Sequence, residues 1–123
     1  MLLVEYWKLV VLERYAKFDG RASRAEYWWF VLANLIAYLV LIILTRISGI
    51  FFVLNALYGL ALIVPSLAVF VRRLHDTNRS GWWFFIGLVP LVGGIVLLVF
   101  VLTAGDKTAN DFGPPPMELG AAT

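Results

Sequence analysis

The sequence predicts an all-α membrane protein in which three transmembrane helices follow an N-terminal amphipathic helix. Two observations support this fold class. The 123 residues are 62% hydrophobic and only 15% charged, which is more apolar surface than a soluble domain of this size can bury. Three uncharged runs, at 27–45, 47–71 and 80–105, each come close to or exceed the roughly 20 apolar residues that a helix needs to cross a bilayer.

The N-terminal segment, residues 1–19, carries too many charges to span a membrane, yet it has a helical pattern. Apolar side chains recur at intervals of three and four, namely Val4, Trp7, Val11, Tyr15 and Phe18. This spacing predicts an amphipathic helix with one apolar face. Such a helix lies in the headgroup plane of the inner leaflet or packs on the cytoplasmic ends of the spans, and the spacing fits both positions.

The first span is expected to begin at a capping box. Ser23 and Glu26 have the S-x-x-E spacing in which the serine accepts from a backbone N–H of the first helical turn. Ser80 is a candidate N-cap at the start of the third run. Tryptophan pairs follow both positions, and indole rings favour the membrane–water interface. We therefore predict four interface anchors on one membrane face: Trp28, Trp29, Trp82 and Trp83.

The distribution of basic residues predicts the orientation. Eight of the ten Lys and Arg residues precede the first run or lie between the second and third. The positive-inside rule then places the N-terminus and the 72–79 loop in the cytoplasm and the C-terminus outside. The transmembrane domain is expected at 23–105, with spans at about 27–45, 50–71 and 82–103 and a hairpin between the first two. Residues 106–123 are expected to form an extended, partly disordered extracytoplasmic tail.

A polar layer is expected inside the spans, at a similar depth in each helix. Its members are Asn34, Pro65, Ser66 and Pro90. Each proline leaves one backbone carbonyl without its helical partner, at Ala61 and at Ile86. The layer is then a substrate or ion position between broken helices, or Asn34 or Ser66 caps a free carbonyl. No Asp, Glu, Lys, Arg or His lies within the runs to serve as a proton or ion relay.

A second candidate site is a basic rim at the cytoplasmic end. Its members are Arg21, Arg24, Arg72, Arg73, His75 and Arg79. Guanidinium groups bind phosphate in a bidentate manner, so anionic lipid headgroups or a protein partner are chemically reasonable ligands. The alternative is that the arginines orient the protein and pair locally with Asp19, Glu26 and Asp76.

Catalysis and metal binding find no support in the sequence. Cysteine is absent, and His75 is the only histidine, too few ligands for a recognisable metal site. No candidate nucleophile stands beside the His75–Asp76 pair. We therefore expect no catalytic residue, no cofactor, no metal and no enzymatic activity. The pI of about 9.2 reflects basic residues whose distribution follows the positive-inside rule. We therefore expect no nucleic-acid partner.

Three motifs in a fixed order resemble a known family: GRASRAEYWWFVL at 20–32, RRLHDTNRSGWW at 72–83 and NDFGPPP at 110–116. Together they are similar to small bacterial inner-membrane proteins of the YhaH/YhaI type, a domain-of-unknown-function family. The resemblance implies a compact polytopic protein of the bacterial inner membrane, without a known activity or cofactor. That family usually has a basic residue where Asp111 stands, which puts a role for that position in doubt.

The leading functional expectation is a non-catalytic accessory or structural subunit. It would associate with itself or with a larger membrane complex through its lipid-facing spans and the basic rim, and it would contact anionic lipids. The alternative is a small oligomeric transporter, channel or lipid-handling protein built around Asn34, Pro65 and Pro90.

Overall fold

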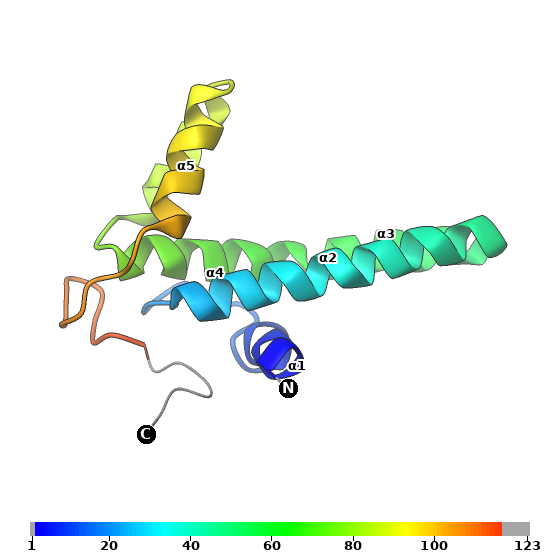
Figure 1. The fold of residues 1–123 in the computed structure, drawn as a ribbon, viewed down its shortest axis with the longest axis horizontal. Coiled ribbons are helices and arrows are strands. Elements are labelled where there is room, and N and C mark those ends of the chain that lie inside the picture. The colour runs from blue at the N-terminus through cyan, green and yellow to red at the C-terminus, as the bar shows by residue number, and fades with distance from the viewer. Residues whose placement is uncertain (1, 117–123) are drawn as a thin grey trace.

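The computed structural model describes residues 2–116, and the regular elements in that part of the chain are all helices. Its longest feature is a hairpin of apolar helices (Figure 1). The first arm is α2 (Arg24–Ile47), and the second consists of α3 (Ile50–Ala61) and α4 (Ile63–Asp76). Only Ser48 and Gly49 connect the arms, which confirms the expected hairpin.

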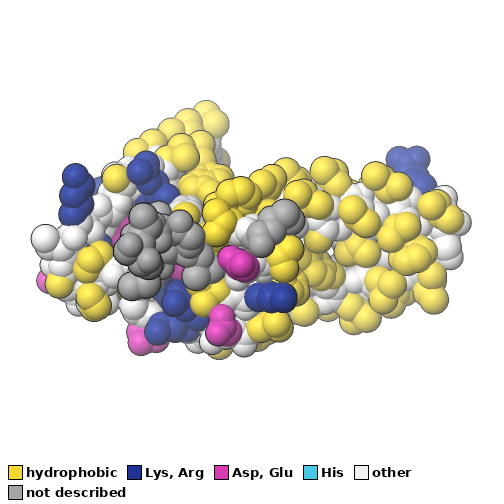
Figure 2. Space-filling view, turned by 60° about the horizontal axis from the view of Figure 1, so that its bottom comes forward, with side chains coloured by type: hydrophobic (Ala, Val, Ile, Leu, Met, Phe, Trp, Pro, Cys, Tyr) yellow, Lys and Arg dark blue, Asp and Glu magenta, His cyan; other side chains and the backbone are white. Residues whose placement is uncertain are grey.

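Both arms are long and apolar enough to cross a bilayer, at 24–47 and 50–76. Hydrophobic side chains cover most of the hairpin surface, whereas Lys, Arg, Asp and Glu are concentrated toward one end (Figure 2). Apolar side chains that stay exposed along a whole helix need a lipid environment or a protein partner. The hairpin therefore has the surface of two membrane-spanning helices.

Helix α2 begins where the capping pattern predicts. The Ser23 hydroxyl oxygen accepts a hydrogen bond from the Glu26 backbone N–H at 3.0 Å. In a full capping box the glutamate also accepts from the backbone N–H of the serine. Here the Glu26 carboxylate instead forms ion pairs with Arg14 and Arg72. The local signal was thus sufficient for the start of the helix, and the tertiary structure redirected the glutamate.

The second arm is interrupted at Leu62, between α3 and α4. Pro65 has no N–H to donate, so the Ala61 carbonyl lacks its helical partner, as predicted. The Tyr15 hydroxyl donates to this carbonyl at 2.7 Å. The cap therefore comes from the N-terminal segment, and the expectation that Asn34 or Ser66 would supply it is wrong.

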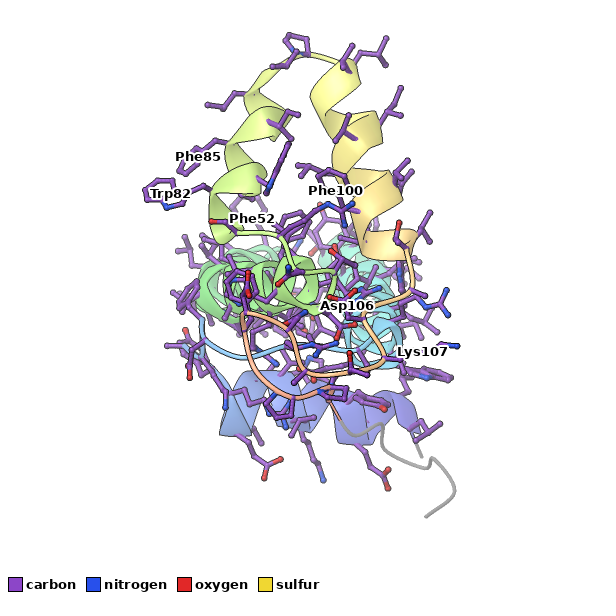
Figure 3. The ribbon with its side chains drawn as sticks, turned by 90° about the vertical axis from the view of Figure 1, so that its left-hand side faces the viewer. Phe52, Trp82, Phe85, Phe100, Asp106 and Lys107 are labelled. Carbon is purple, nitrogen blue, oxygen red and sulfur yellow. The ribbon has the colours of Figure 1, made fainter. Side chains whose placement is uncertain are left out.

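The N-terminal segment forms α1 (Leu2–Lys8), which continues as one π-helical stretch, η1 (Leu9–Glu13). Helix α1 runs crosswise to α2. In Figure 1, α2 runs across the view and α1 is seen end-on, and in Figure 3, turned by 90°, α1 is seen along its length. Helical structure ends at Glu13 rather than near residue 19. Gly20, with φ +85°, makes the turn toward α2.

The buried face of this segment differs from the predicted stripe. Tyr6, Val10 and Val11 are buried, whereas Val4, Tyr15 and Phe18 of the predicted stripe are exposed. The π-helical stretch changes the angular spacing of side chains, which an ideal 3.6-residue period does not anticipate. The core lies where this segment meets α2 and the second arm, and it includes Val10, Val11, Ala22, Phe30, Leu62 and Val69.

The third apolar run does not form one span. It folds into two short antiparallel arms, η2 (Gly81–Leu88, a 3₁₀ helix) and α5 (Val92–Leu102), which stand crosswise to α2 and α4 (Figures 1 and 3). Each arm is about 16 Å long, roughly half the hydrocarbon thickness of a bilayer. The predicted single helix at 82–103 is therefore wrong.

The reversal occurs at Val89–Leu91. Pro90 cannot continue the helical hydrogen bonds, and Leu91 adopts a φ of +64°, which turns the chain back. Gly93 then allows the arms to meet closely, because a Cβ at this position would lie 1.8 Å from the Ile86 carbonyl oxygen.

The tail returns to the end of α4 rather than leaving on the other side. The Asp106 backbone N–H donates to the Asp76 carbonyl at 2.8 Å, and Asn110 pairs with Gly113 in a single β-bridge. Groups that are hydrogen-bonded to each other cannot lie on opposite faces of a bilayer. The prediction that residues from 106 onward lie opposite the 72–79 loop is thus wrong as far as residue 116, and the predicted disorder at 117–123 lies outside the described residues.

Candidate functional site

The polar end of the molecule contains a buried charge cluster, a name we use for Arg21, Glu26, Arg72, Arg73 and Asp76. All five residues are at most 5% exposed. The α2–α4 hairpin explains their meeting, since it brings the first turn of α2 beside the last turn of α4. Unpaired charges are rarely buried, so the partners of these groups define the site.

Asp76 is shared by two arginines. Arg21 Nε donates to Asp76 Oδ1 at 2.9 Å, and Arg73 Nη1 donates to Asp76 Oδ2 at 2.7 Å. Gly105 of the tail passes directly over this carboxylate, because a Cβ at Gly105 would lie 1.8 Å from Asp76 Oδ2. Only glycine fits this close approach.

Arg21 holds the tail through its remaining donors. Its Nη1 donates to the carbonyls of Thr108 at 2.9 Å and Gly113 at 3.1 Å. Its Nη2 donates to the carbonyls of Asp76, at 3.4 Å, and of Asp106. Together with the Nε bond, the five N–H groups of this guanidinium have five acceptors. Arg21 is therefore the point at which the tail is fixed to the start of α2.

Arg73 joins the end of α5 to the same point. Its Nε donates to the Val101 carbonyl at 3.0 Å, and its Nη2 donates to the Thr103 carbonyl. Its Nη1 also reaches the Ala22 carbonyl at 3.3 Å. The last carbonyls of a helix lack partners within it, so Arg73 caps α5 and sets the base of the η2–α5 hairpin.

Glu26 forms the second half of the cluster. Its carboxylate accepts from Arg14 Nη1 at 2.7 Å and from Arg72 Nη1, while Arg72 Nε donates to the Lys17 carbonyl at 2.9 Å. Arg72 Nη2 is the one buried side-chain nitrogen or oxygen without a hydrogen bond in the described part of the chain. This half fixes the N-terminal segment to the helical hairpin.

His75 holds the NDFG segment of the tail. The Gly20 carbonyl can only accept, so His75 Nδ1 donates to it, at 2.8 Å. The imidazole ring stacks on Phe112 with 3.9 Å between centroids and 2° between planes. Asn110 Nδ2 donates to the His75 carbonyl at 3.0 Å. His75 therefore contacts the turn at Gly20 on one side and the tail on the other. Asp76 does not orient the imidazole ring.

The six residues of the predicted basic rim do gather at one end, but four of them are inside. Arg21, Arg72, Arg73 and His75 are buried, and all four bind other groups of the protein. Arg24 is exposed, and Arg79 lies partly exposed with its guanidinium carbon 4.0 Å from the Phe100 ring centroid. A role in lipid or partner contact remains a prediction for these two.

The predicted polar layer is only partly assembled. Asn34 and Ser66 line one cavity of about 410 Å³ next to Tyr58, and Pro65 is buried close by in the chain. Pro90 lies at the exposed turn of the η2–α5 hairpin, and this turn stands apart from α2 and α3 (Figure 1). The expected layer therefore lacks its third-run member.

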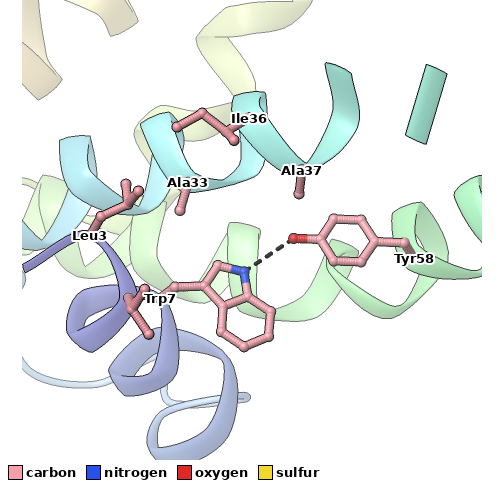
Figure 4. Close-up of a pocket in the computed structure, with 7 residues that line it drawn as sticks. Leu3, Trp7, Ala33, Ile36, Ala37 and Tyr58 are labelled. Carbon is pink, nitrogen blue, oxygen red and sulfur yellow. Dashed lines mark hydrogen bonds between the residues drawn. The ribbon is translucent and has the colours of Figure 1, made fainter. Parts of the chain in front are cut away.

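Two residues that sequence reasoning did not connect with Asn34 complete its surroundings. Trp7 Nε1 donates to the Tyr58 hydroxyl at 3.1 Å, and that hydroxyl donates to Asn34 Oδ1 at 2.7 Å. The indole and the phenol also line an apolar cavity of about 290 Å³ beneath α2 (Figure 4). The sequence offered one signal for these two residues: the indole N–H of Trp7 and the hydroxyl of Tyr58 are polar groups that need hydrogen-bond partners when they are buried.

The four tryptophans have different surroundings. Trp28 Nε1 donates to the Val101 carbonyl at 3.2 Å, and Trp29 is half-buried. Trp82 points away from the η2–α5 hairpin, beside Phe85 (Figure 3), and Trp83 is exposed as well. Their role as interface anchors stays a prediction.

Among the described residues, no group of three or more His, Asp or Glu side chains could hold a metal ion.

Exposed apolar helices and charges buried at one end define a small α-helical membrane protein. Residues 15–114 match the family described as "Protein of unknown function (DUF805)". The chain belongs to this family.

The relatives agree with that class. The chain is 43% identical to the inner membrane protein YhaH of Escherichia coli K12 over 115 residues, which cover 89% of this chain and 95% of YhaH. It is 45% identical to the inner membrane protein YhaI of the same strain over 111 residues, covering 89% and 94%. A more distant match is the uncharacterized protein YiiR, at 35% over 72 residues, covering 58% and 49%. No solved structure matches the chain.

Proposed function

We propose that this protein is a non-catalytic accessory or structural component of the bacterial inner membrane, which associates with another membrane protein or with further copies of itself. The observation that carries the proposal is the η2–α5 hairpin. Its residues are apolar on all sides, and Trp82, Leu88 and Leu91 are 77%, 78% and 79% exposed.

The position of this hairpin supports a protein partner. If α2 and α3–α4 cross the bilayer, a hairpin crosswise to them lies along the membrane (Figure 1). One of its sides then faces the polar headgroups, where apolar side chains are unfavourable. A second protein surface that covers this side removes the conflict. The oligomeric transporter or channel expected as the alternative depends on a layer that Pro90 does not join, and it is the weaker proposal.

The revised fold also changes the proposed orientation. With the tail at the same end as Arg21, Lys107 joins the arginines at 21–24 and 72–79 there, whereas Arg46 lies at the opposite end of α2. The positive-inside rule and the location printed for YhaH and YhaI support an inner-membrane protein whose N-terminal segment and tail both face the cytoplasm.

Site-specific photo-crosslinking in intact cells tests the partner. A photoreactive residue is placed at Leu91 on the hairpin turn or, as a matched control, at Phe52 on α3, which is also exposed and apolar. We expect one protein adduct of defined mass from Leu91, equal to a second copy or to one larger partner, and only lipid adducts from Phe52. If Leu91 yields lipid adducts alone, the accessory role is contradicted.

A further inference from the structure

A small polar cavity lies between the start of α2 and the returning tail, and we call it the tail cavity. It has a volume of about 200 Å³, and its lining includes Ser23 and Arg24 from the helix and Gly105, Asp106 and Lys107 from the tail. α2 has 24 residues, and the first N–H groups of a helix point outward with partial positive charge. The tail thus closes a cavity over a positive helix end.

Several hydrogen-bond donors at this cavity have no strong acceptor. Ser23 is 5% exposed, and its hydroxyl accepts from Glu26 but donates its own proton to no described residue. The guanidinium of Arg24 has one long hydrogen bond, to the Leu102 carbonyl at 3.4 Å. Lys107 donates to nothing in residues 2–116 and lies at the outer side of the tail (Figure 3). The ligand that fits is an anion with several acceptor oxygens.

Two carboxylates line the same cavity, and both are compensated. Asp76 is neutralised by Arg21 and Arg73, which together exceed it by one positive charge. The Asp106 carboxylate accepts from Asn110 Nδ2 at 3.0 Å, and Arg24 with Lys107 outweighs it by one charge. The surroundings therefore remain positive, as an anion requires.

An apolar stripe continues from the cavity along α2. Trp28, Leu32, Leu35 and Leu39 follow Arg24 at intervals of three and four, which places them on one helix face. The three leucines are exposed. An anion bound at Arg24 would have acyl chains lying along this stripe, so the site has the form of a phospholipid: a charged head followed by an apolar strip.

We propose that the tail cavity binds the phosphate of an anionic phospholipid, with Ser23, Arg24 and Lys107 as its ligands. The buried arginines do not touch the lipid, and their role is to hold the tail in the position that completes the cavity. The proposal is independent of a protein partner at the η2–α5 hairpin.

The test uses the full chain in phosphatidylcholine nanodiscs that contain a small fraction of phosphatidylglycerol, with native mass spectrometry to measure retained lipid. The double variant Arg24→Gln/Lys107→Gln is compared with Arg46→Gln, which removes an exposed arginine at the opposite end of α2. We expect retained phosphatidylglycerol to fall about tenfold or more in the double variant and by less than twofold in Arg46→Gln. Thermal unfolding of both variants verifies that they fold, and Arg24→Lys should restore part of the binding.

Three outcomes overturn the proposal. Equal loss in the double variant and in Arg46→Gln would show non-specific attraction to basic residues. Undiminished retention in a folded double variant would place the lipid elsewhere. Millimolar inorganic phosphate is added as the competing probe, and full displacement of the lipid by phosphate would identify a site for a soluble anion rather than for a membrane lipid.

Discussion

At the scale of single residues, the buried charge cluster shows how charge is kept inside a small protein. Each oxygen of Asp76 binds one guanidinium, and the other donors of Arg21 and Arg73 bind backbone carbonyls. Removing one partner of such a group leaves a buried charge without compensation, and this costs more than the pair contributes when it is intact. The cluster is therefore most sensitive at its shared acid.

Replacing Asp76 with asparagine should strongly destabilise the protein. The change keeps the side-chain shape but leaves Arg21 and Arg73 facing a neutral group, so the free energy of unfolding should fall by about 3–5 kcal/mol. Thermal unfolding in detergent micelles measures the effect. Asp111→Asn is the control, since the Asp111 carboxylate is exposed and makes no ion pair with any described residue. Similar unfolding temperatures for the two variants would contradict the charge assignment.

At the scale of elements, the third apolar run shows that an apolar segment of sufficient length does not have to form one continuous helix. Its length and composition suit a membrane span, yet Pro90 and the positive φ of Leu91 divide it into two arms. Glycine then permits the arms to pack tightly at Gly93. The hairpin is held by close backbone contact, which a single methyl group would disturb.

The two adjacent glycines of α5 provide a matched test. Gly93→Ala places a Cβ 1.8 Å from the Ile86 carbonyl oxygen, whereas a Cβ at Gly94 meets nothing within 4 Å. We expect Gly93→Ala to destabilise the protein by about 1–3 kcal/mol. Gly94→Ala should be neutral or slightly stabilising, because alanine favours a helix. Thermal unfolding that follows tryptophan fluorescence distinguishes them, and equal values would contradict the hairpin geometry.

At the scale of the whole molecule, the polar end is a junction of four segments. The N-terminal segment is joined to α2 by the Arg14–Glu26 pair and to α4 by the bond from Arg72 to the Lys17 carbonyl. The tail is joined to α4 through the Asp76 carbonyl. The far end of the long hairpin has only the short turn at Ser48. If both arms of the long hairpin cross the bilayer, as we propose, the N-terminal segment and the tail lie on the same side of the membrane.

Cysteine labelling measures this arrangement directly, because the chain has no cysteine of its own. Single cysteines replace three exposed residues: Ala16, Ser48 and Ala109. An impermeant maleimide applied to inside-out membrane vesicles should label Ala16→Cys and Ala109→Cys, and the same reagent on spheroplasts should label Ser48→Cys alone. If Ala109→Cys behaves like Ser48→Cys, the tail lies on the opposite side and the third run crosses the membrane.

The sequence by itself determined the class of protein, the all-helical content, the two long apolar arms, the start of α2 at Ser23 and the carbonyl left free by Pro65. These features depend on residues within one or two helical turns, so composition, periodicity and capping chemistry are sufficient to predict them. Only the tertiary structure decided that the third run folds back, that the tail returns and that four members of the basic rim are buried. The physical reason is separation along the chain: Arg21 meets Asp76 across 55 positions and Gly113 across 92. No local pattern specifies such partners, because they exist only once the α2–α4 hairpin has brought its two ends together.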